Sequence, residues 1–397
     1  MIRHQLPAYS PVSAKAVLLA TGQLSGLGED PRPRLRALLQ REYEASSVLL
    51  CGSGTQALTI AIQEARHRVD QKAPVALPAF SCFDVASAAI GANALVSLYD
   101  LDPYTLSPDL ESLERTLRAG AGVVVVAPLY GIPVDWHALT SLTKRYEAVL
   151  VEDAAQGHGA SWKGKRLGAL GEIGILSFGR GKGWTGGSGG AILMSHSSGL
   201  ASGGFPEPEL SRRVAVSIGV AAQWALARPE IYGLPLSIPA LRLGETTYLP
   251  PRPVRAMTRV AAATLVATYE ASLKEADVRQ SNATVLVTAI ADCQQVTPIP
   301  TQSCRHAGYL RLPVRVSKGM ASFLDAQRAL HLGITPSYPM SLAALPQLAG
   351  RLVGPERVWA GAQTLVRELV TVPTHSRLSA RDLSLIIGIL RTVESFY

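Results

Sequence analysis

Two polar side chains with chemical potential follow two short apolar runs in the middle of the chain. The run at 149–151 ends in an acidic pair that includes Asp153. The run at 173–176 leads through Ser177 to a glycine-flanked lysine, Lys182. Such runs are typical of parallel strands, and open α/β sheets bind ligands beyond the carboxyl ends of their strands. The sequence therefore predicts that the carboxylate of Asp153 and the amine of Lys182 meet in one ligand site.

A carboxylate and an amine held together suit the cofactor pyridoxal 5'-phosphate (PLP). PLP needs a lysine that forms a Schiff base and a carboxylate that faces its pyridine nitrogen. The amine must be unprotonated to attack, which burial favours. Each residue also has an ordinary interpretation when taken alone. Asp153 could be a strand-end acid bonded to turn amides, and Lys182 could be a solvated loop lysine.

A glycine-rich turn upstream supplies the third part of the predicted site. The segment Gly52-Ser53-Gly54-Thr55-Gln56-Ala57 follows one apolar run and opens a helical pattern. Backbone amides at a helix start bind anions, and Ser177 offers a hydroxyl to the same phosphate. The turn also matches the G-x-G-x-x-A dinucleotide fingerprint, but the next apolar segment carries no acid for a ribose hydroxyl. A plain helix start is the remaining interpretation.

The elements that must position these residues alternate between strand and helix patterns from about residue 47 to 195. This alternation predicts an α/β fold with a mainly parallel central sheet flanked by helices. The expected strands are 48–50, 75–77, 94–99, 123–127 and 148–152, and the expected helices are 55–66, 84–91 and 136–146. A further helix is expected at Ser107-Pro108-Asp109, with Pro108 in its first position. The segment 159–166 approaches a P-loop, but Arg166 replaces the metal-binding hydroxyl, so a β-hairpin is expected there.

The chain beyond Lys182 has a different pattern. A glycine run leads into an expected strand at 191–194, and a Pro- and Gly-punctuated region follows that contains an apolar helix at Val214–Ala227. A long helix at 254–276, a strand at 309–316 and a terminal helix after Ser379 are expected next. We therefore expect a large PLP-binding domain with an N-terminal arm at 1–265 and a small C-terminal α/β domain at 266–397.

Composition excludes several classes of protein. The chain has 397 residues, of which 47% are hydrophobic and 17% charged, which is typical of a globular protein. Its net charge of +8 is scattered rather than clustered, which argues against a nucleic-acid partner. The apolar helix is too short to span a bilayer, and the N-terminus lacks the apolar run of a signal peptide. No metal-ligand spacing is present, and free thiols in the cytoplasm are expected for Cys51, Cys82, Cys293 and Cys304.

An ordered set of motifs along the chain is similar to that of a known family. The chain resembles the DegT/StrS-type aminotransferases, which are PLP enzymes of fold type I that commonly aminate nucleotide-linked keto-sugars. The resemblance covers nearly the whole chain and depends most on the following segments: Ser53-Gly54-Thr55, Pro78-Ala79-Phe80-Ser81, Leu129-Tyr130-Gly131, Glu152 to Gln156 with Gly159-Ala160, Ser177-Phe178 before Lys182, Tyr338-Pro339, Leu345-Pro346 and Val372-Pro373-Thr374-His375.

The resemblance implies a role for each site residue. Lys182 would form the Schiff base and move the proton, and Asp153 would face the pyridine nitrogen. Gln156 would donate to the phenolic oxygen of the cofactor. An aromatic residue normally stacks on the ring, and Phe83 is the expected one, although Phe83 packed only into the core is the alternative. The phosphate would be held by Gly54, Thr55 and Ser177, with the backbone amide of Gln56 nearby.

The same resemblance implies transamination by a homodimer with its site at the subunit interface. The expected donor is glutamate, and the expected acceptor is a keto or aldehyde compound, above all a nucleotide-linked keto-sugar. The segment 244–248 lacks the asparagine with which relatives reach the partner's phosphate, so this cross-subunit contact stays open. Two other functions also stay open: a PLP-fold protein with altered or lost turnover, and an NAD-dependent oxidoreductase that uses Gly52–Ala57.

Overall fold

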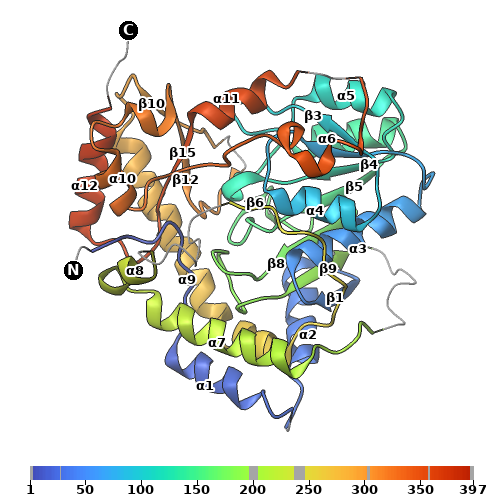
Figure 1. The fold of residues 1–397 in the computed structure, drawn as a ribbon, viewed down its shortest axis with the longest axis horizontal. Helices are drawn as coiled ribbons and strands as arrows, with labels where there is room; N and C mark the ends of the chain where they lie inside the picture. The colour runs from blue at the N-terminus through green and yellow to red at the C-terminus, as the bar shows by residue number, and fades with distance from the viewer. Residues whose placement is uncertain are drawn as a thin grey trace.

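The computed structural model describes residues 3–26, 28–195, 204–236, 246–301, 305–355 and 358–393, and it has an α/β fold built on two main sheets (Figure 1). The larger sheet has eight strands in the order β1-β9-β8-β5-β4-β2-β3-β14. Its strands are β1 (Ser47–Cys51), β2 (Val75–Pro78), β3 (Val96–Tyr99), β4 (Val123–Val126), β5 (Val149–Asp153), β8 (Ile173–Ser177), β9 (Gly190–Met194) and β14 (Leu352–Val353).

The large sheet is mainly parallel, as the sequence predicts. Five of its seven neighbouring strand pairs run parallel, and only the β8–β9 and β9–β1 pairs are antiparallel. Every residue of β2, β3 and β4 is buried. Full burial explains why these strands are continuous apolar runs such as Val123–Val126, because helices cover both faces of a parallel sheet.

The helices that flank this sheet come mostly from the N-terminal half of the chain. Helix α3 packs on β8, β9 and β5, while α5 and α6 pack on β3 and β5. Their bounds are α1 (Ala14–Gly22), α2 (Pro31–Tyr43), α3 (Gly54–His67), α4 (Phe83–Gly91), α5 (Leu110–Arg118) and α6 (Trp136–Arg145), with a 3-10 turn, η1, at Leu129–Gly131. These helices and strands agree with the sequence pattern to within a few residues.

One predicted helix start is wrong. Helix α5 begins at Leu110, and Asp109 is its N-cap, whose carboxylate accepts the N–H of Ser112 at 3.0 Å. Pro108 lies before the cap and bridges to Leu101 in extended backbone. An aspartate cap satisfies an otherwise unpaired amide of the first turn, so it sets the helix start in place of the proline.

The C-terminal part of the chain forms the smaller sheet, which is antiparallel and has the order β10-β12-β15-β13. Its strands are β10 (Val296–Pro298), β12 (Leu312–Val316), β13 (Thr335–Pro336) and β15 (Leu369–Val372), and its helices are α10 (Ala326–His331), α11 (Ala360–Glu368) and α12 (Ala380–Arg391). Helix α12 starts with the expected N-cap Ser379, which forms a full capping box with Asp382.

The 31-residue helix α9 (Arg259–Ala289) links the two parts of the molecule (Figure 1). It packs against α1, α2 and α7 (Leu210–Leu226) and also against α12. The chain therefore passes residue 265 inside an unbroken helix, and the domain boundary at that residue stays a prediction. The predicted apolar helix at 214–227 is α7, and α8 (Pro229–Leu236) follows it.

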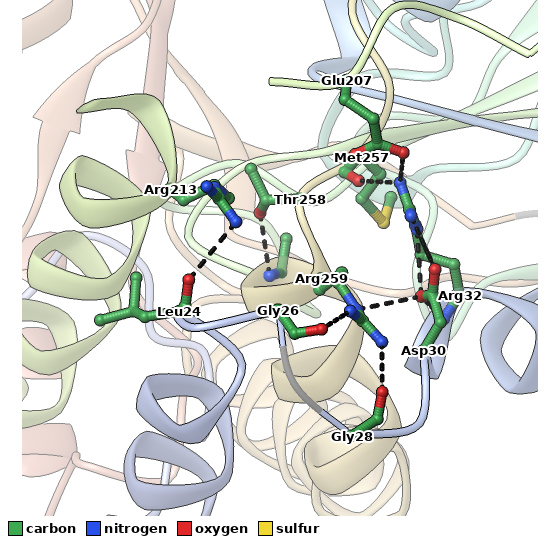
Figure 2. Close-up of polar contacts among 11 residues, drawn as sticks. Leu24, Gly26, Gly28, Asp30, Arg32, Glu207, Arg213, Met257, Thr258 and Arg259 are labelled. Atoms are coloured by element: carbon green, nitrogen blue, oxygen red, sulfur yellow. Dashed lines mark hydrogen bonds and ion pairs between the residues drawn. The ribbon is translucent and has the colours of Figure 1, made fainter. Parts of the chain in front are cut away.

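Arginine side chains from α7 and α9 hold the loop that joins α1 to α2 (Figure 2). Arg213 donates to the carbonyl of Leu24 at 3.4 Å, and Arg259 donates to that of Gly28 at 2.7 Å. Arg32, at the start of α2, pairs with Glu207 at 2.6 Å. These contacts fix the N-terminal helices onto α7 and α9.

The P-loop-like segment is the expected hairpin. Strands β6 (Ser161–Trp162) and β7 (Lys165–Arg166) pair antiparallel around Lys163 and Gly164, both of which have positive φ. Strand β11 (Arg305–His306) pairs with β6 to complete a three-stranded sheet. Within the described ranges, no helix combines the length and hydropathy that crossing a membrane requires.

Candidate active site

The side chains of Lys182 and Asp153 line one cavity of about 450 Å³ beyond the carboxyl ends of β5 and β8. Asp153 is the last residue of β5, and Lys182 lies in the loop after β8. The two strands are neighbours and run parallel, which brings their ends to the same edge of the sheet. The lining residues are Gly54, Thr55, Leu58, Ser81, Cys82, Asp84, Val85, Ala127, Pro128, Leu129, Asp153, Ala155, Gln156, Ile175, Ser177 and Lys182.

The two acids at the end of β5, Glu152 and Asp153, have different surroundings, because successive strand residues point to opposite faces of the sheet. Glu152 is fully buried and accepts backbone N–H bonds from Gly168, Leu170 and Gly171 at 2.6 to 3.1 Å. It therefore fastens the loop that precedes β8. Burial raises the pKa of Glu152 to about 7, against the opposing effect of those three donors.

Asp153 is the acid that faces the cavity. Only 9% of its surface is exposed, and its Oδ1 accepts the N–H of Ala155 at 3.0 Å. Burial raises the pKa of Asp153, while the Ala155 amide and the charge of Lys182 lower it. A cationic group beside this carboxylate would offset the cost of burying its charge.

The start of α3 lies against the end of β8 and forms another part of the cavity wall. Ser53 caps the helix, and Gly54 and Thr55 contribute its first-turn amides. A Cβ atom on Gly54 would lie 2.4 Å from the Cβ of Ser177, so only glycine allows this approach. First-turn amides have no acceptor within their helix, so this part of the wall presents N–H groups and a hydroxyl to a ligand.

Gln56, the fourth residue expected at the phosphate, is turned away. Its backbone N–H donates to the Oγ of Ser53 at 3.2 Å, which is the capping bond of α3. Its side chain donates to the carbonyl of Pro253 at 2.9 Å and accepts the N–H of Arg255 at 3.3 Å. The backbone amide of Gln56 is therefore occupied by the helix cap, and the residue is absent from the cavity lining.

Gln156 lines the cavity, and two tyrosines fix its orientation. Its Oε1 accepts the N–H of Tyr130 at 2.7 Å, and its Nε2 donates to the hydroxyl of Tyr338 at 2.8 Å. One N–H of the amide remains for a ligand. Tyr130 and Gly131 have φ of 56° and 75°, and the close approach of Gly131 to the carbonyl of Gln156 leaves no room for a Cβ.

Phe83, the residue expected to stack on the cofactor ring, lies in the core and not in the cavity lining, and its stacking role stays a prediction. Phe83 is 4% exposed, belongs to the hydrophobic core and does not line the cavity. The preceding residue, Cys82, lines it together with Ser81. Phe83 begins α4, and the helical turn directs its ring into the core. The alternative that Phe83 packs only into the core agrees with this arrangement.

Asp84 is a lining residue that sequence reasoning missed. It belongs to the first turn of α4 and is half-buried. Cys82 and Asp84 directly follow the motif Pro78-Ala79-Phe80-Ser81, so their proximity to that motif was the available signal. The spacing alone did not tell which of three consecutive residues faces the ligand.

The backbone at Lys182 is held from two sides. The hydroxyl of Ser10, in the N-terminal arm, donates to the carbonyl of Lys182. Behind the next residue lies Arg279 of α9, which is fully buried and donates to the carbonyls of His158 at 2.9 Å and Gly308 at 3.0 Å. A Cβ on Gly183 would lie 3.0 Å from two nitrogens of this guanidinium, so the close packing favours glycine. Burial lowers the pKa of Arg279 to about 10.

A second, smaller cavity of about 240 Å³ lies behind Lys182. His158 and Trp184 line it, and their rings are 5.5 Å apart. Burial lowers the pKa of His158 to about 3, so this histidine is neutral at ordinary pH.

Helix α7 covers the glycine run that follows Lys182. A Cβ on Gly187 would lie 2.7 Å from a methyl group of Val220, and Thr185 bonds the side chain of Gln223 at 3.1 Å. The buried face of α7 therefore packs on the segment that leads from Lys182 into β9. The segment 244–248, which lacks the asparagine of relatives, lies partly outside the described residues, so the cross-subunit contact stays open.

Comparison with known proteins agrees with this geometry. Residues 22–200 match the DegT/DnrJ/EryC1/StrS aminotransferase family. An L-glutamine:2-deoxy-scyllo-inosose aminotransferase of Streptomyces lividus is 32% identical over 192 residues, which are 47% of this chain and 45% of the relative. A 3-amino-5-hydroxybenzoate synthase of Amycolatopsis mediterranei is 31% identical over 44% of this chain and 45% of its own length. The matched region thus spans about half the length of these curated relatives.

Solved structures extend the similarity to the whole chain. The sugar aminotransferase CalS13 from Micromonospora echinospora superposes with a TM-score of 0.76 at 18% identity, over 99% of this chain and 100% of its own. A DegT DnrJ EryC1 StrS aminotransferase from Brucella abortus gives a TM-score of 0.72 at 18% identity, over 95% of both chains. The fold is that of these solved aminotransferases, and residues 22–200 match the model of the DegT/DnrJ/EryC1/StrS aminotransferase family.

Proposed function

We propose that this protein is a PLP-dependent aminotransferase that uses Lys182 as its Schiff-base lysine. The observation that carries the proposal is a single cavity lined by Gly54, Thr55 and Ser177 together with Asp153 and Lys182. An anion site, an amine and a buried carboxylate in one cavity match the phosphate, the aldehyde and the ring nitrogen of PLP.

The fit of the phosphate end depends on a close approach of backbone. At Gly54 a Cβ would lie 2.4 Å from that of Ser177, so the helix amides and the hydroxyl reach the same small space. The helix dipole adds a favourable potential for a phosphate there. These features support Gly54, Thr55 and Ser177 as phosphate ligands.

Bound there, PLP would supply an aldehyde and an electron-accepting ring that stabilises negative charge on a substrate carbon. Lys182 would bond to the aldehyde and later hold and move the proton at its Nζ. Asp153 would keep the ring nitrogen protonated, since its buried carboxylate favours a cationic neighbour. Gln156, fixed by Tyr130 and Tyr338, would donate its remaining N–H to the phenolic oxygen.

For the substrates we propose a glutamate-type amino donor and a polyhydroxylated ring ketone as acceptor. Relatives are named for L-glutamine as donor and for scyllo-inosose-type acceptors, which supports a ring ketone and adds glutamine to the donors to be tried. The solved sugar aminotransferases of the same fold support a keto-sugar, including a nucleotide-linked one.

We also propose that the protein works as a cytoplasmic homodimer with the site at the subunit interface. The three cysteines among the described residues, Cys51, Cys82 and Cys293, are free, which suits a reducing compartment. Light scattering of the PLP-loaded protein would give the mass, and a monomer that transaminates at full rate would contradict the interface.

The test of the function is a PLP titration of the purified protein. We expect a visible absorbance band that borohydride bleaches, and a spectral change when glutamate or glutamine is added. The Lys182→Ala variant should lose the borohydride-sensitive band and its activity should fall by roughly 10²–10⁴-fold, since proton transfer alone contributes that much. A wild-type protein that stays colourless with PLP would refute the proposal, whereas a coloured protein inert to all amino donors would support a PLP-fold protein without turnover.

A further inference from the structure

The candidate active site holds one more carboxylate than the expected chemistry uses. Among the described residues, the ionisable side chains that line the cavity are Cys82, Asp84, Asp153 and Lys182. Asp153 faces the cofactor ring nitrogen under the proposed function, and Lys182 bonds the aldehyde. Asp84 has no assigned role.

The position of Asp84 keeps its charge in the cavity. It lies in the first turn of α4, where the helix dipole favours a negative charge. It is half-buried between Phe83 and Val85, which are both buried. Within the part of the chain that the structure describes, no lysine or arginine forms an ion pair with Asp84.

The field of Asp84 reaches the acid at the end of β5. After burial, which is the largest cause, the charge of Asp84 further raises the pKa of Asp153, and the charge of Lys182 opposes it. Asp84 also raises the pKa of the Cys82 thiol, which burial lifts to about 12, so the thiol is neutral. Because Asp84 and Asp153 both line the cavity, their negative potentials add within it.

A carboxylate such as that of Asp84 would repel a phosphate dianion, so Asp84 does not suit a phosphate-binding role. The phosphate end is made of amides and a hydroxyl from Gly54, Thr55 and Ser177, with no charged side chain. A cationic group is what two carboxylates favour, and the protonated ring nitrogen of PLP is the cation expected beside Asp153.

We propose that Asp84 is a positioning residue that acts with Asp153 to keep the ring nitrogen of bound PLP protonated. This inference rests on the proposed function. Asp84 does not bond the reacting atoms; its charge beside Asp153 disfavours loss of the proton from the ring. The consequence is a ring that withdraws electrons more strongly at neutral pH than Asp153 alone would maintain.

The test uses the full-length protein loaded with PLP labelled with ¹⁵N in the ring. The nitrogen chemical shift reports the protonated fraction directly, in wild type, Asp84→Asn and Asp84→Glu. We expect Asp84→Asn to lower the ratio of protonated to unprotonated ring by about tenfold, because one neighbouring charge moves a pKa by on the order of one unit. Asp84→Glu, which keeps the charge, should restore the wild-type shift.

Kinetics of the donor half-reaction supply a second readout. Asp84→Asn should lower kcat in proportion to the protonated fraction that the nitrogen shift reports, while KM changes by less than about threefold, since the substrate is not contacted. The control is Glu111→Gln, which removes an exposed acid from the first turn of α5, away from the cavity, and should leave shift and kcat unchanged.

An unchanged ¹⁵N shift in Asp84→Asn would overturn the inference, and an accompanying rise in KM would assign Asp84 to substrate binding instead. Failure of the proposed function is a different outcome, since wild type would then show no borohydride-sensitive band and no bound label. If Asp84→Asn binds PLP through Lys182 but keeps the wild-type ¹⁵N shift, the proposed function is supported and the proposed role of Asp84 is wrong.

Discussion

The two ends of the cavity are built from different materials. The phosphate end consists of the start of α3 packed on Ser177, so backbone amides and one hydroxyl provide it. The ring end consists of side chains from separate segments, among them Asp153 from β5 and Cys82 and Asp84 from α4. A backbone-built end tolerates no added atoms but carries no titratable group. A side-chain-built end tolerates changes of size but depends on charge.

The largest effect should follow from adding one carbon at the backbone-built end. In Gly54→Ala the new Cβ would lie 2.4 Å from the Cβ and 2.5 Å from the Oγ of Ser177. Because the contact involves the Cα and Cβ of a strand residue, which cannot move without the strand, we expect a loss of about 3 kcal/mol in the free energy of unfolding. PLP affinity should fall at least about tenfold with the displaced amides. Urea unfolding and a PLP titration measure the two effects.

The matched control is Gly388→Ala in the interior of α12, where a Cβ meets nothing within 4 Å. That change should raise stability by about 0.4–1 kcal/mol, because alanine restricts the unfolded chain and favours the helix. Equal stability of Gly54→Ala and wild type would mean that the close approach of α3 to Ser177 is not a constraint.

The difference between the two ends also explains what the sequence could predict. The strands of the large sheet and its mainly parallel character follow from buried apolar runs and the helices between them, and the phosphate turn is a contiguous segment, Gly52–Thr55, next to a helix pattern. Such signals depend only on residues that are close in sequence, so they can be interpreted without the tertiary structure. Gln56 is the exception, because its amide belongs to the cap of α3, and the sequence does not say which first-turn amide the cap occupies.

The ring end needed tertiary information. Of the three consecutive residues Ser81, Cys82 and Phe83, the first two line the cavity, and Phe83, the first residue of α4, packs in the core. The role of Asp84 depends on the phase of the same helix. Arg279 is separated from Lys182 by nearly a hundred residues of sequence, so no local pattern connects the two.

A smaller effect should appear as a pH dependence of the free energy of unfolding, caused by a histidine behind Lys182. The pKa of His158, in the wall behind Lys182, is lowered by burial from 6.5 to about 3. Its contribution to stability is fully present above pH 6.5 and is lost as pH falls toward 3, because the unfolded chain takes up the proton first. Because pH 5 lies 1.5 units below the ordinary histidine pKa of 6.5, the free energy of unfolding should be about 2 kcal/mol lower at pH 5 than at pH 7.

The variant His158→Phe isolates this loss, since phenylalanine keeps a ring beside Trp184 and cannot be protonated. Between pH 7 and pH 5 its free energy of unfolding should fall by about 2 kcal/mol less than that of wild type. His375, whose pKa is lowered to about 4, is present in both proteins and cancels in the comparison. Parallel pH profiles for the two proteins would show that His158 does not titrate on unfolding.

The smallest effect should separate two neighbouring residues. Cys82→Ala removes a lining atom, so it should change PLP affinity by a few-fold and shift the visible band, with stability altered by less than about 1 kcal/mol. Phe83→Leu reshapes the core, so it should cost about 1 kcal/mol of stability and leave the band unchanged. Both variants are measured by PLP titration and urea unfolding. The reverse pattern, with the band shifted only by Phe83→Leu, would return the ring contact to Phe83 and show that α4 turns when the cofactor binds.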